Sequence, residues 1–262
     1  MKFPKITVVV PSYNKIKYIR ETLDSLLSQK YPNLEVIIQD CGSTDWTLAV
    51  IKEYAQTYPE IIKWESKKDN GQLDAINLGL SKAKGEIVSY LNADDALEKF
   101  ALIEVGKYFS QNPKTLWLAG KAKVVDEDGK EIVRLVGCYK NFLMKLNRNC
   151  LLLFVNYLMQ PAVFLTKRAY QKYGPFAGTC DFVMEYDLWL RLAKAQMPAV
   201  LNISLAKFRI EKNAKTWLMH DKLLQEDEKL VKKYTKSCLI FFVHKLHNWL
   251  RTLVVNYLQS RL

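Results

Sequence analysis

Residues 6–29 read ITVVVPSYNKIKYIRETLDSLLSQ, and this stretch decides the fold class. Its first five residues are apolar or β-branched without a gap, which predicts a strand buried on both faces. Pro11 ends that run, and Ile19, Leu23 and Leu26 then recur at the spacing of one helix face. A buried strand followed by an amphipathic helix is the repeating unit of a parallel α/β sheet.

The same alternation continues through the first hundred residues. Further strands are predicted at residues 34–40, 61–66 and 87–91, and helices at 46–58, 72–85 and 96–110. This order predicts a doubly wound, mostly parallel sheet flanked by helices. Residues 115–137 then predict a hairpin that turns at 127–130, and the later segments predict a strand and helix at 162–174 and helices at 182–196, 216–234 and 238–262. We therefore expect one α/β domain over residues 1–235 and a C-terminal helical extension over residues 236–262.

The formal net charge of the 262 residues is +12, and its distribution is uneven. No acidic residue occurs between Ile132 and Cys180, and none from Lys229 to the end, although both segments contain several lysines and arginines. This asymmetry indicates an anionic partner such as membrane phosphates, nucleic acid or a phosphorylated substrate. A basic surface that serves only solubility is the plainer interpretation.

The five cysteines are scattered and odd in number, which argues against a disulfide framework and favours a reducing compartment such as the cytoplasm. The N-terminal apolar run stops at Pro11, so we expect neither a signal peptide nor an anchor there. The longest purely apolar run, Cys150–Val155, is far too short to span a bilayer.

Residues 86–97, EIVSYLNADDAL, deliver Asn92, Asp94 and Asp95 to the end of a buried strand. Asp40 ends another predicted strand, and ligands of open α/β sheets bind at the carboxyl ends of the strands. An Asp-Asp turn by itself is most often a solvated turn. Together with Asp40, however, it predicts an acidic edge that holds Mn²⁺ or Mg²⁺ on a substrate phosphate. No G-x-G-x-x-G or P-loop sequence is present, which argues against dinucleotide or P-loop binding.

Two longer stretches, VVVPSYNKIKYIRETLDSLLSQKYPNLEVIIQDCGSTDWT and DNGQLDAINLGLSKAKGEIVSYLNADDAL, carry a family resemblance. They closely resemble the family 2 glycosyltransferases of the GT-A fold, and the resemblance extends over roughly residues 6–234. It implies a Rossmann-like domain that takes a sugar from a nucleotide-diphosphate sugar. It also implies a divalent metal and a role in bacterial polysaccharide or lipopolysaccharide assembly.

The resemblance implies roles for particular residues. Those that would line the nucleotide and donor sugar are Pro11, Tyr13, Asn14, Asp40, Asp69, Gly71, Gln72, Asn92 and Asp95, with Asn77 nearby. Asp40 falls on the carboxylate that reads the base, usually uracil. Asn92 replaces the first acid of the D-x-D region, and Asp94 falls on the metal-binding position.

An inverting transfer requires a base that removes the proton of the acceptor hydroxyl. The segment MEYDLWLRLA, residues 184–193, resembles the family segment that carries this base. Glu185 falls on the catalytic position, where the family normally has Asp, and Asp187 lies two residues on, so both stay open with Glu185 preferred. Each could instead be a carboxylate that stabilises a helix start, and Arg191 could pair with Asp187. Gln160-Pro161 matches a position on the acceptor side.

The segment KFRIEKNAKT, residues 207–216, resembles a family segment near the leaving group. Arg209, Lys212 and Lys215 are therefore expected to contact the leaving diphosphate. The family usually has His where this chain has Glu211.

The C-terminal segment CLIFFVHKLHNWLRTLVVNYLQSRL combines aromatic and basic residues. As a helix it would group apolar side chains on one side, namely Leu239, Phe242, Leu246, Trp249, Leu250, Leu253 and Leu258. This pattern favours a helix that lies on the inner surface of the cell membrane, and packing on the domain or on a second subunit is the alternative.

The sequence thus predicts a metal-dependent, inverting glycosyltransferase that uses a nucleotide-diphosphate sugar, with UDP-sugars favoured, and a glycan or lipid-linked acceptor. A nucleotidyltransferase that makes a nucleotide sugar is the alternative enzyme, but PSYNKIKY stands where such enzymes have a glycine-rich loop. A non-enzymatic protein that binds anionic lipid or nucleic acid would explain the charge and leave the acidic strand ends unexplained.

Overall fold

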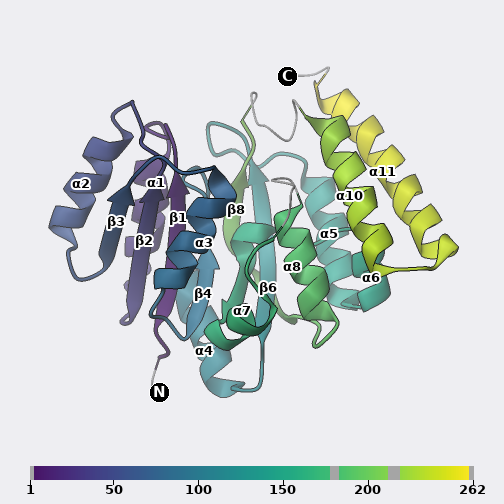
Figure 1. The fold of residues 1–262 in the computed structure, drawn as a ribbon, viewed down its shortest axis with the longest axis horizontal. Coiled ribbons are helices and arrows are strands. Elements are labelled where there is room, and N and C mark those ends of the chain that lie inside the picture. The colour runs from purple at the N-terminus through teal and green to yellow at the C-terminus, as the bar shows by residue number, and fades with distance from the viewer. Residues whose placement is uncertain (1–2, 178–182, 212–218, 260–262) are drawn as a thin grey trace.

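The computed structural model describes residues 3–177, 183–211 and 219–259 of the 262-residue chain. Figure 1 shows a central sheet with helices packed along it, from α2 at one end of the molecule to α11 at the other. The strands are β1 Ile6–Ser12, β2 Leu34–Asp40, β3 Ile62–Ser66, β4 Ile87–Tyr90, β5 Ala96–Leu97, β6 Trp117–Val125, β7 Val163–Thr166 and β8 Ala199–Arg209. The helices are α1 Ile19–Leu27, α2 Thr47–Thr57, α3 Gln72–Lys82, α4 Ala101–Gln111, α5 Arg134–Leu146, α6 Asn149–Phe154, α7 Lys167–Tyr173, α8 Met184–Ala193, α10 His220–Tyr234 and α11 Cys238–Gln259, with a 3₁₀ turn at Gln160–Ala162.

The strands form one sheet in the order β3-β2-β1-β4-β7-β6-β8-β5. β1 pairs in parallel with β2 and β4, β2 pairs in parallel with β3, and β6 pairs in parallel with β8. β7 runs antiparallel to β4 and β6, and the short β5 runs antiparallel to β8. The predicted α/β sheet of mostly parallel strands flanked by helices is confirmed.

Alternate residues of β1 face opposite layers of helices. Val9 belongs to a buried cluster with Ile76 and Leu80 of α3, whereas Val8 and Val10 belong to a second cluster that contains the apolar face of α1. Because helices cover both faces of this strand, most of its side chains are apolar. The buried exception within residues 6–10 is Thr7, whose hydroxyl donates to the Glu35 carboxylate at 2.5 Å.

The hairpin predicted for residues 115–137 is only partly formed. β6 ends at Val125, a turn follows, and Glu131 makes an antiparallel bridge to Val125. Ile132 donates to the Val124 carbonyl at 2.8 Å, and the chain then enters α5 instead of continuing as a second strand. The apolar residues of the second half instead recur at helical spacing, with Leu143 and Met144 buried.

The helix predicted at the C-terminus is observed over Cys238–Gln259. α11 packs against α10 and α6, and the buried His244 ring makes a 3.0 Å hydrogen bond to the Phe154 carbonyl of α6. The division of the chain at residue 235 stays a prediction.

Candidate active site

The loops after β1 and β2 are tied together at the carboxyl edge of the sheet. Ser12 and Asp40, the last residues of these strands, lie in register. The buried Asp40 carboxylate accepts hydrogen bonds from the hydroxyls of Ser43 at 2.5 Å and Ser66 at 2.6 Å. Asn14 adopts a left-handed backbone with φ of 50°, and its N–H donates to the Ser43 hydroxyl at 2.9 Å. Asp40 is thus the centre of a network that fixes three strand ends.

Two further residues predicted to line the donor lie on this edge. Pro11 is buried within β1, in register with Gln39. Tyr13 follows the end of the strand with its side chain 55% exposed. An exposed aromatic ring beside a strand end is suited to stacking on a nucleotide base.

The start of α3 reaches across this edge to the turn after β4. Asp69 accepts hydrogen bonds from the Cys41 thiol at 2.7 Å and from the Gly71 backbone at 2.8 Å. Gly71 has a φ of 115°, which glycine adopts at little cost. The Gln72 amide then donates to the Asn92 side-chain oxygen at 2.7 Å. Segments from residues 41, 69–72 and 92 therefore meet in one place.

A lysine lies between two carboxylates at the centre of the site. The Lys15 ammonium is 2.7 Å from the Asp94 carboxylate and also hydrogen-bonds to Glu211, which follows β8. Burial acts to lower the pKa of Lys15, but the two acids outweigh this effect and raise it, so the ammonium stays charged. Two carboxylates from distant parts of the chain thus face one positive charge.

The second acid of the turn has a different environment. Asp95 is 1% exposed, and its carboxylate accepts hydrogen bonds from the Arg209 backbone at 2.8 Å and from the Asn92 amide at 3.2 Å. Burial, together with the neighbouring charge of Asp94, raises the pKa of Asp95 well above its ordinary value. The two adjacent acids are tolerated because Asp94 faces a cation while burial favours the protonated form of Asp95.

Arg209 does not lie where a leaving diphosphate would meet it. Its guanidinium is buried, donates to the carbonyls of Asp94, Asp126 and Glu127 at 2.9–3.1 Å, and pairs with Glu21 at 2.5 Å. These partners are protein groups, so the Arg209 side chain helps to hold the turn at residues 92–95, which we call the acidic turn, in place. This placement argues against the diphosphate contact expected from the sequence.

Glu185, at the start of α8, faces the end of β4. Its carboxylate accepts a hydrogen bond from the buried Tyr90 hydroxyl. Burial raises the pKa of Glu185, and the Tyr90 hydrogen bond acts against that rise. Burial also raises the pKa of Tyr90 well above its ordinary value, with contributions from Glu185 and from Asp95. The phenol therefore lies within electrostatic reach of both the predicted base and the acidic turn.

Asp187 is engaged in holding helices together. Its carboxylate accepts hydrogen bonds from Arg191 one turn later at 2.9 Å and from the Tyr234 hydroxyl of α10 at 2.7 Å. The side chain is 7% exposed. This arrangement favours Glu185 over Asp187 as the base.

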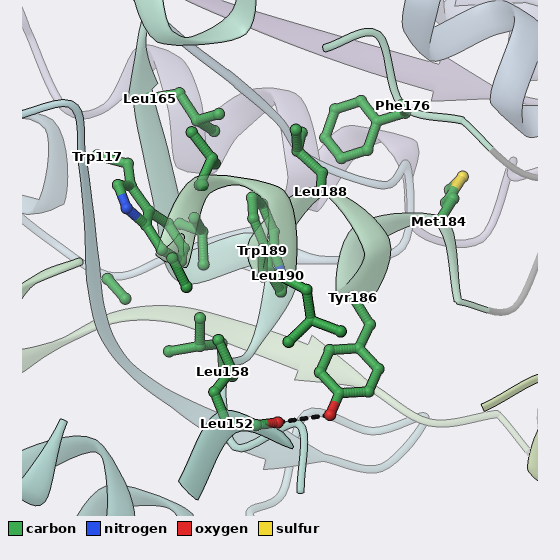
Figure 2. Packing of buried hydrophobic residues seen from close by; sticks show 14 of the residues in the cluster. Trp117, Leu152, Leu158, Leu165, Phe176, Met184, Tyr186, Leu188, Trp189 and Leu190 are labelled. Atoms are coloured by element: carbon green, nitrogen blue, oxygen red, sulfur yellow. Dashed lines mark hydrogen bonds between the residues drawn. The ribbon is translucent and has the colours of Figure 1, made fainter. Parts of the chain in front are cut away.

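The helix that carries Glu185 is held by a large apolar cluster (Figure 2). Trp189 stacks on Trp117 of β6, with ring centroids 5.5 Å apart, and meets Phe176 edge-on at 6.1 Å. The Tyr186 hydroxyl donates to the Leu152 carbonyl of α6 at 2.5 Å. These contacts fix the register of α8 and with it the position of the Glu185 carboxylate.

The residues present fit a divalent cation bound together with a substrate. Among residues 3–177, 183–211 and 219–259, no three His, Cys, Asp or Glu side chains converge to hold a metal unaided. Mg²⁺, however, is usually held by one or two carboxylates plus substrate phosphates. Asp94 and Glu211 supply two such carboxylates, and the Lys15 ammonium between them marks a point where both meet a cation.

Other predicted residues are placed as follows. Asn77 anchors the loop after α7, because its side chain bonds both backbone groups of Phe176 and accepts from the Tyr170 hydroxyl. The Gln160 amide donates to the carbonyl of Tyr90, the last residue of β4, at 2.7 Å. Lys212 and Lys215 lie outside the described residues.

Three residues of the site have no role among those predicted from the sequence. Lys15 and Tyr90 were not selected, and Glu211 was noted only as a replacement for the family's His. Lys15 directly follows the donor loop, and Tyr90 is the last residue of β4, so position at a strand end was the available signal.

Comparisons with known proteins bear on the fold and on the family of this chain. An uncharacterized glycosyltransferase of Rickettsia bellii is 27% identical over 191 residues, which are 72% of this chain and 27% of that protein, so the chain spans about a quarter of this relative's length. The mannosyltransferase PcManGT of Pyrobaculum calidifontis, solved with GDP-Man and Mn²⁺, has a TM-score of 0.70 and 18% identity, covering 99% of this chain and 73% of that chain. S. aureus TarS 1-349, solved with UDP-GlcNAc, has a TM-score of 0.63 and 20% identity, covering 88% of this chain and 71% of that chain.

A family assignment rests on the sequence itself. The sequence model of Glycosyl transferase family 2 matches residues 7–174, from β1 to the end of α7. This match includes the acidic turn and both loops that meet it. Because it covers more than half of the chain, the chain belongs to glycosyl transferase family 2.

Proposed function

We propose that this protein transfers a sugar from a nucleotide-diphosphate sugar to a hydroxyl of a glycan or a lipid-linked acceptor. The observation that carries the proposal is that Asp94 and Glu211 both pair with the Lys15 ammonium, at the edge of the sheet where Glu185 bonds to Tyr90. A cation site made of carboxylates and a partly buried carboxylate base are the two parts that a metal-dependent, inverting glycosyl transfer uses.

The donor would lie across the loops after β1 and β2. Asp40 is held at the centre of that network and is our candidate for reading the base, with a preference for uridine by resemblance. Both solved relatives described above hold nucleotide-diphosphate sugars, one UDP-GlcNAc and the other GDP-Man. They support a nucleotide-diphosphate sugar as the donor, whereas the preference for uridine is part of our proposal.

Glu185 would act as the general base. As the acceptor oxygen forms its bond to the anomeric carbon, the hydroxyl proton passes to the Glu185 carboxylate. The bond from that carbon to the diphosphate oxygen breaks, and its electron pair leaves with the nucleotide diphosphate. Attack from the side opposite the leaving group inverts the anomeric configuration. Burial raises the pKa of Glu185 and so makes the carboxylate a stronger base.

Asp94 and Glu211 would hold Mn²⁺ or Mg²⁺. When bound, the ion supplies positive charge that offsets the charge developing on the departing diphosphate. Lys15 already places a positive charge at this point. The Arg209 backbone N–H donates to the Asp95 carboxylate, and the Arg209 side chain donates to the Asp94 carbonyl. These two bonds keep the turn in position.

We further propose that the enzyme acts in cell-surface polysaccharide synthesis, at the inner face of the cell membrane. Within the described part of the chain, no helix combines the length and apolarity needed to cross a bilayer. We propose that the contact with the membrane is peripheral.

A panel of nucleotide sugars tests the proposal. Release of nucleoside diphosphate would be followed with Mn²⁺ present, for the wild type and for Asp94→Asn, Glu185→Gln and the control Asp221→Asn, which changes an exposed acid of α10. We expect both site variants to lose activity while the control keeps it. Full activity in either site variant would remove that residue from the mechanism, and pyrophosphate production from a sugar phosphate and a nucleoside triphosphate would instead indicate a nucleotidyltransferase.

A further inference from the structure

The outward side of α11 is covered with large apolar side chains. Leu239 is 71% exposed, Phe242 65%, Trp249 58% and Leu253 48%, and the row also includes Leu246 and Leu250. These residues recur every three or four positions along one side of the 22-residue helix. The opposite side, with His244 buried, packs on α6 and α10. The exposed row is therefore not the side that holds the helix to the domain.

A second apolar row on α5 adjoins the first. Leu135 is 85% exposed, Phe142 59%, and Tyr139 and Leu146 are also exposed. The Tyr139 ring stacks on His247 of α11, with centroids 6.0 Å apart, so the two helices meet at this point. We call the exposed residues of these two rows the α5–α11 face. Figure 1 places both helices in the part of the molecule opposite α2.

The ionised side chains that α5 and α11 themselves carry in the described residues are all positive. Neither helix contains an acidic residue, and Arg134, Lys145 and Lys245 are exposed among or beside the apolar rows. Two acids of α10 meet α11: Glu228 lies 3.8 Å from Lys245, and the buried Asp227 lies 3.5 Å from His244, on the packed side of the helix. An apolar row flanked by cations complements a layer of anionic headgroups over acyl chains. A second copy of the chain would present the same positive charge and would be repelled.

We propose that the α5–α11 face lies in the interfacial layer of an anionic bilayer, with Phe242 and Trp249 inserted among the acyl chains. This deepens the peripheral localisation proposed above and rests on it. Single exposed apolar residues are ordinary on protein surfaces, but contiguous rows on two adjoining helices mark an interaction site.

The face is mechanically connected to the proposed base. α11 bonds to the Phe154 carbonyl of α6, and the Leu152 carbonyl of the same short helix accepts the Tyr186 hydroxyl, next to Glu185. Docking of the face would therefore hold α8 at a fixed height over the membrane.

Sedimentation with vesicles tests this proposal. Vesicles of phosphatidylcholine alone would be compared with vesicles that also contain phosphatidylglycerol, at low and high salt. We expect the full chain to bind the anionic vesicles, to bind them less at high salt, and to bind neutral vesicles more weakly. The double variant Phe242→Glu/Trp249→Glu should lower the affinity by at least about tenfold. Trp64→Glu, which changes a partly exposed tryptophan of the edge strand β3, is the matched control and should bind as the wild type does.

The outcomes separate this proposal from the enzymatic one. Circular dichroism would establish that the double variant is folded, and its binding of nucleotide sugar in solution should equal that of the wild type, because the face is remote from the donor loops. Wild type that stays in the supernatant with anionic vesicles would overturn the membrane proposal alone. A dimer in solution that the double variant dissociates would assign the face to a second copy and would also overturn it.

Discussion

Replacement of Tyr90 by Phe tests how the structure tunes its proposed base. The Tyr90 hydroxyl donates to the Glu185 carboxylate, and this bond opposes the rise in pKa that burial causes. A hydrogen bond to a charged group contributes about 1.5–3 kcal/mol. Since one pKa unit corresponds to about 1.4 kcal/mol, its loss should move the ionisation of Glu185 upward by about one to two pH units.

The direction of the kinetic effect follows from the role of a base. Glu185 accepts a proton only when ionised, so the acid limb of kcat/KM against pH follows its ionisation in the free enzyme. In Tyr90→Phe that limb should move toward higher pH by the same one to two units. Activity well above the limb should change much less, because the carboxylate is ionised there in both proteins.

The assay would be the pH profile of nucleoside diphosphate release with the nucleotide sugar selected from the panel. Tyr170→Phe is the matched control, since it removes a partly buried hydroxyl that bonds Asn77 instead of a carboxylate. Its acid limb should coincide with that of the wild type. An unmoved limb in Tyr90→Phe, with the hydroxyl gone and the fold intact, would refute the reasoning that Tyr90 tunes the catalytic base.

Three other perturbations follow from the structure. Lys15→Met removes the ammonium that competes with a metal ion for Asp94 and Glu211, so calorimetry should show that Mn²⁺ binds about tenfold or more tightly in the absence of donor. The control Lys17→Met breaks an exposed ion pair with Glu127 and should leave Mn²⁺ binding unchanged. Weaker Mn²⁺ binding by Lys15→Met would contradict this prediction. Trp189→Ala should lower the free energy of unfolding in urea by about 3–5 kcal/mol, whereas Trp249→Ala on the exposed row should change it by about 0.5 kcal/mol or less; equal losses would contradict the burial difference. The raised pKa of Asp95 means that the folded protein holds a proton more tightly than the unfolded chain, so the free energy of unfolding should fall as pH rises above about 4. Asp95→Asn should remove that contribution, and identical pH dependence in variant and wild type would contradict it.

The first half of the fold is predictable because its elements are decided locally. The run at residues 6–10 is apolar or β-branched on both faces because helices cover both, and this pattern is visible in the sequence alone. The hairpin expected after β6 is only partly formed. After one bridge between Val125 and Glu131 its second strand gives way to α5, whose buried Leu143 and Met144 pack in a cluster with residues from far along the chain.

The candidate site, too, could be predicted only in part from the sequence. The placement of Asp40, Asn92 and Asp94 at one edge follows from the direction of parallel strands. The partners of side chains do not follow from sequence spacing. Arg209 is bonded to carbonyls and to Glu21, and Asp187 is bonded to a tyrosine of α10, because the fold brings these groups together from far along the chain.

The most direct test of the account is calorimetric titration of the panel of nucleotide sugars, with and without Mn²⁺, into the wild type and Asp94→Asn. We expect at least one nucleotide sugar to bind, Mn²⁺ to tighten its binding to the wild type, and Asp94→Asn to lose this enhancement. Mn²⁺-enhanced binding of equal strength in Asp94→Asn, or no binding of any nucleotide sugar by the folded wild type, would contradict the claim that the acidic edge seats a cation and an activated sugar.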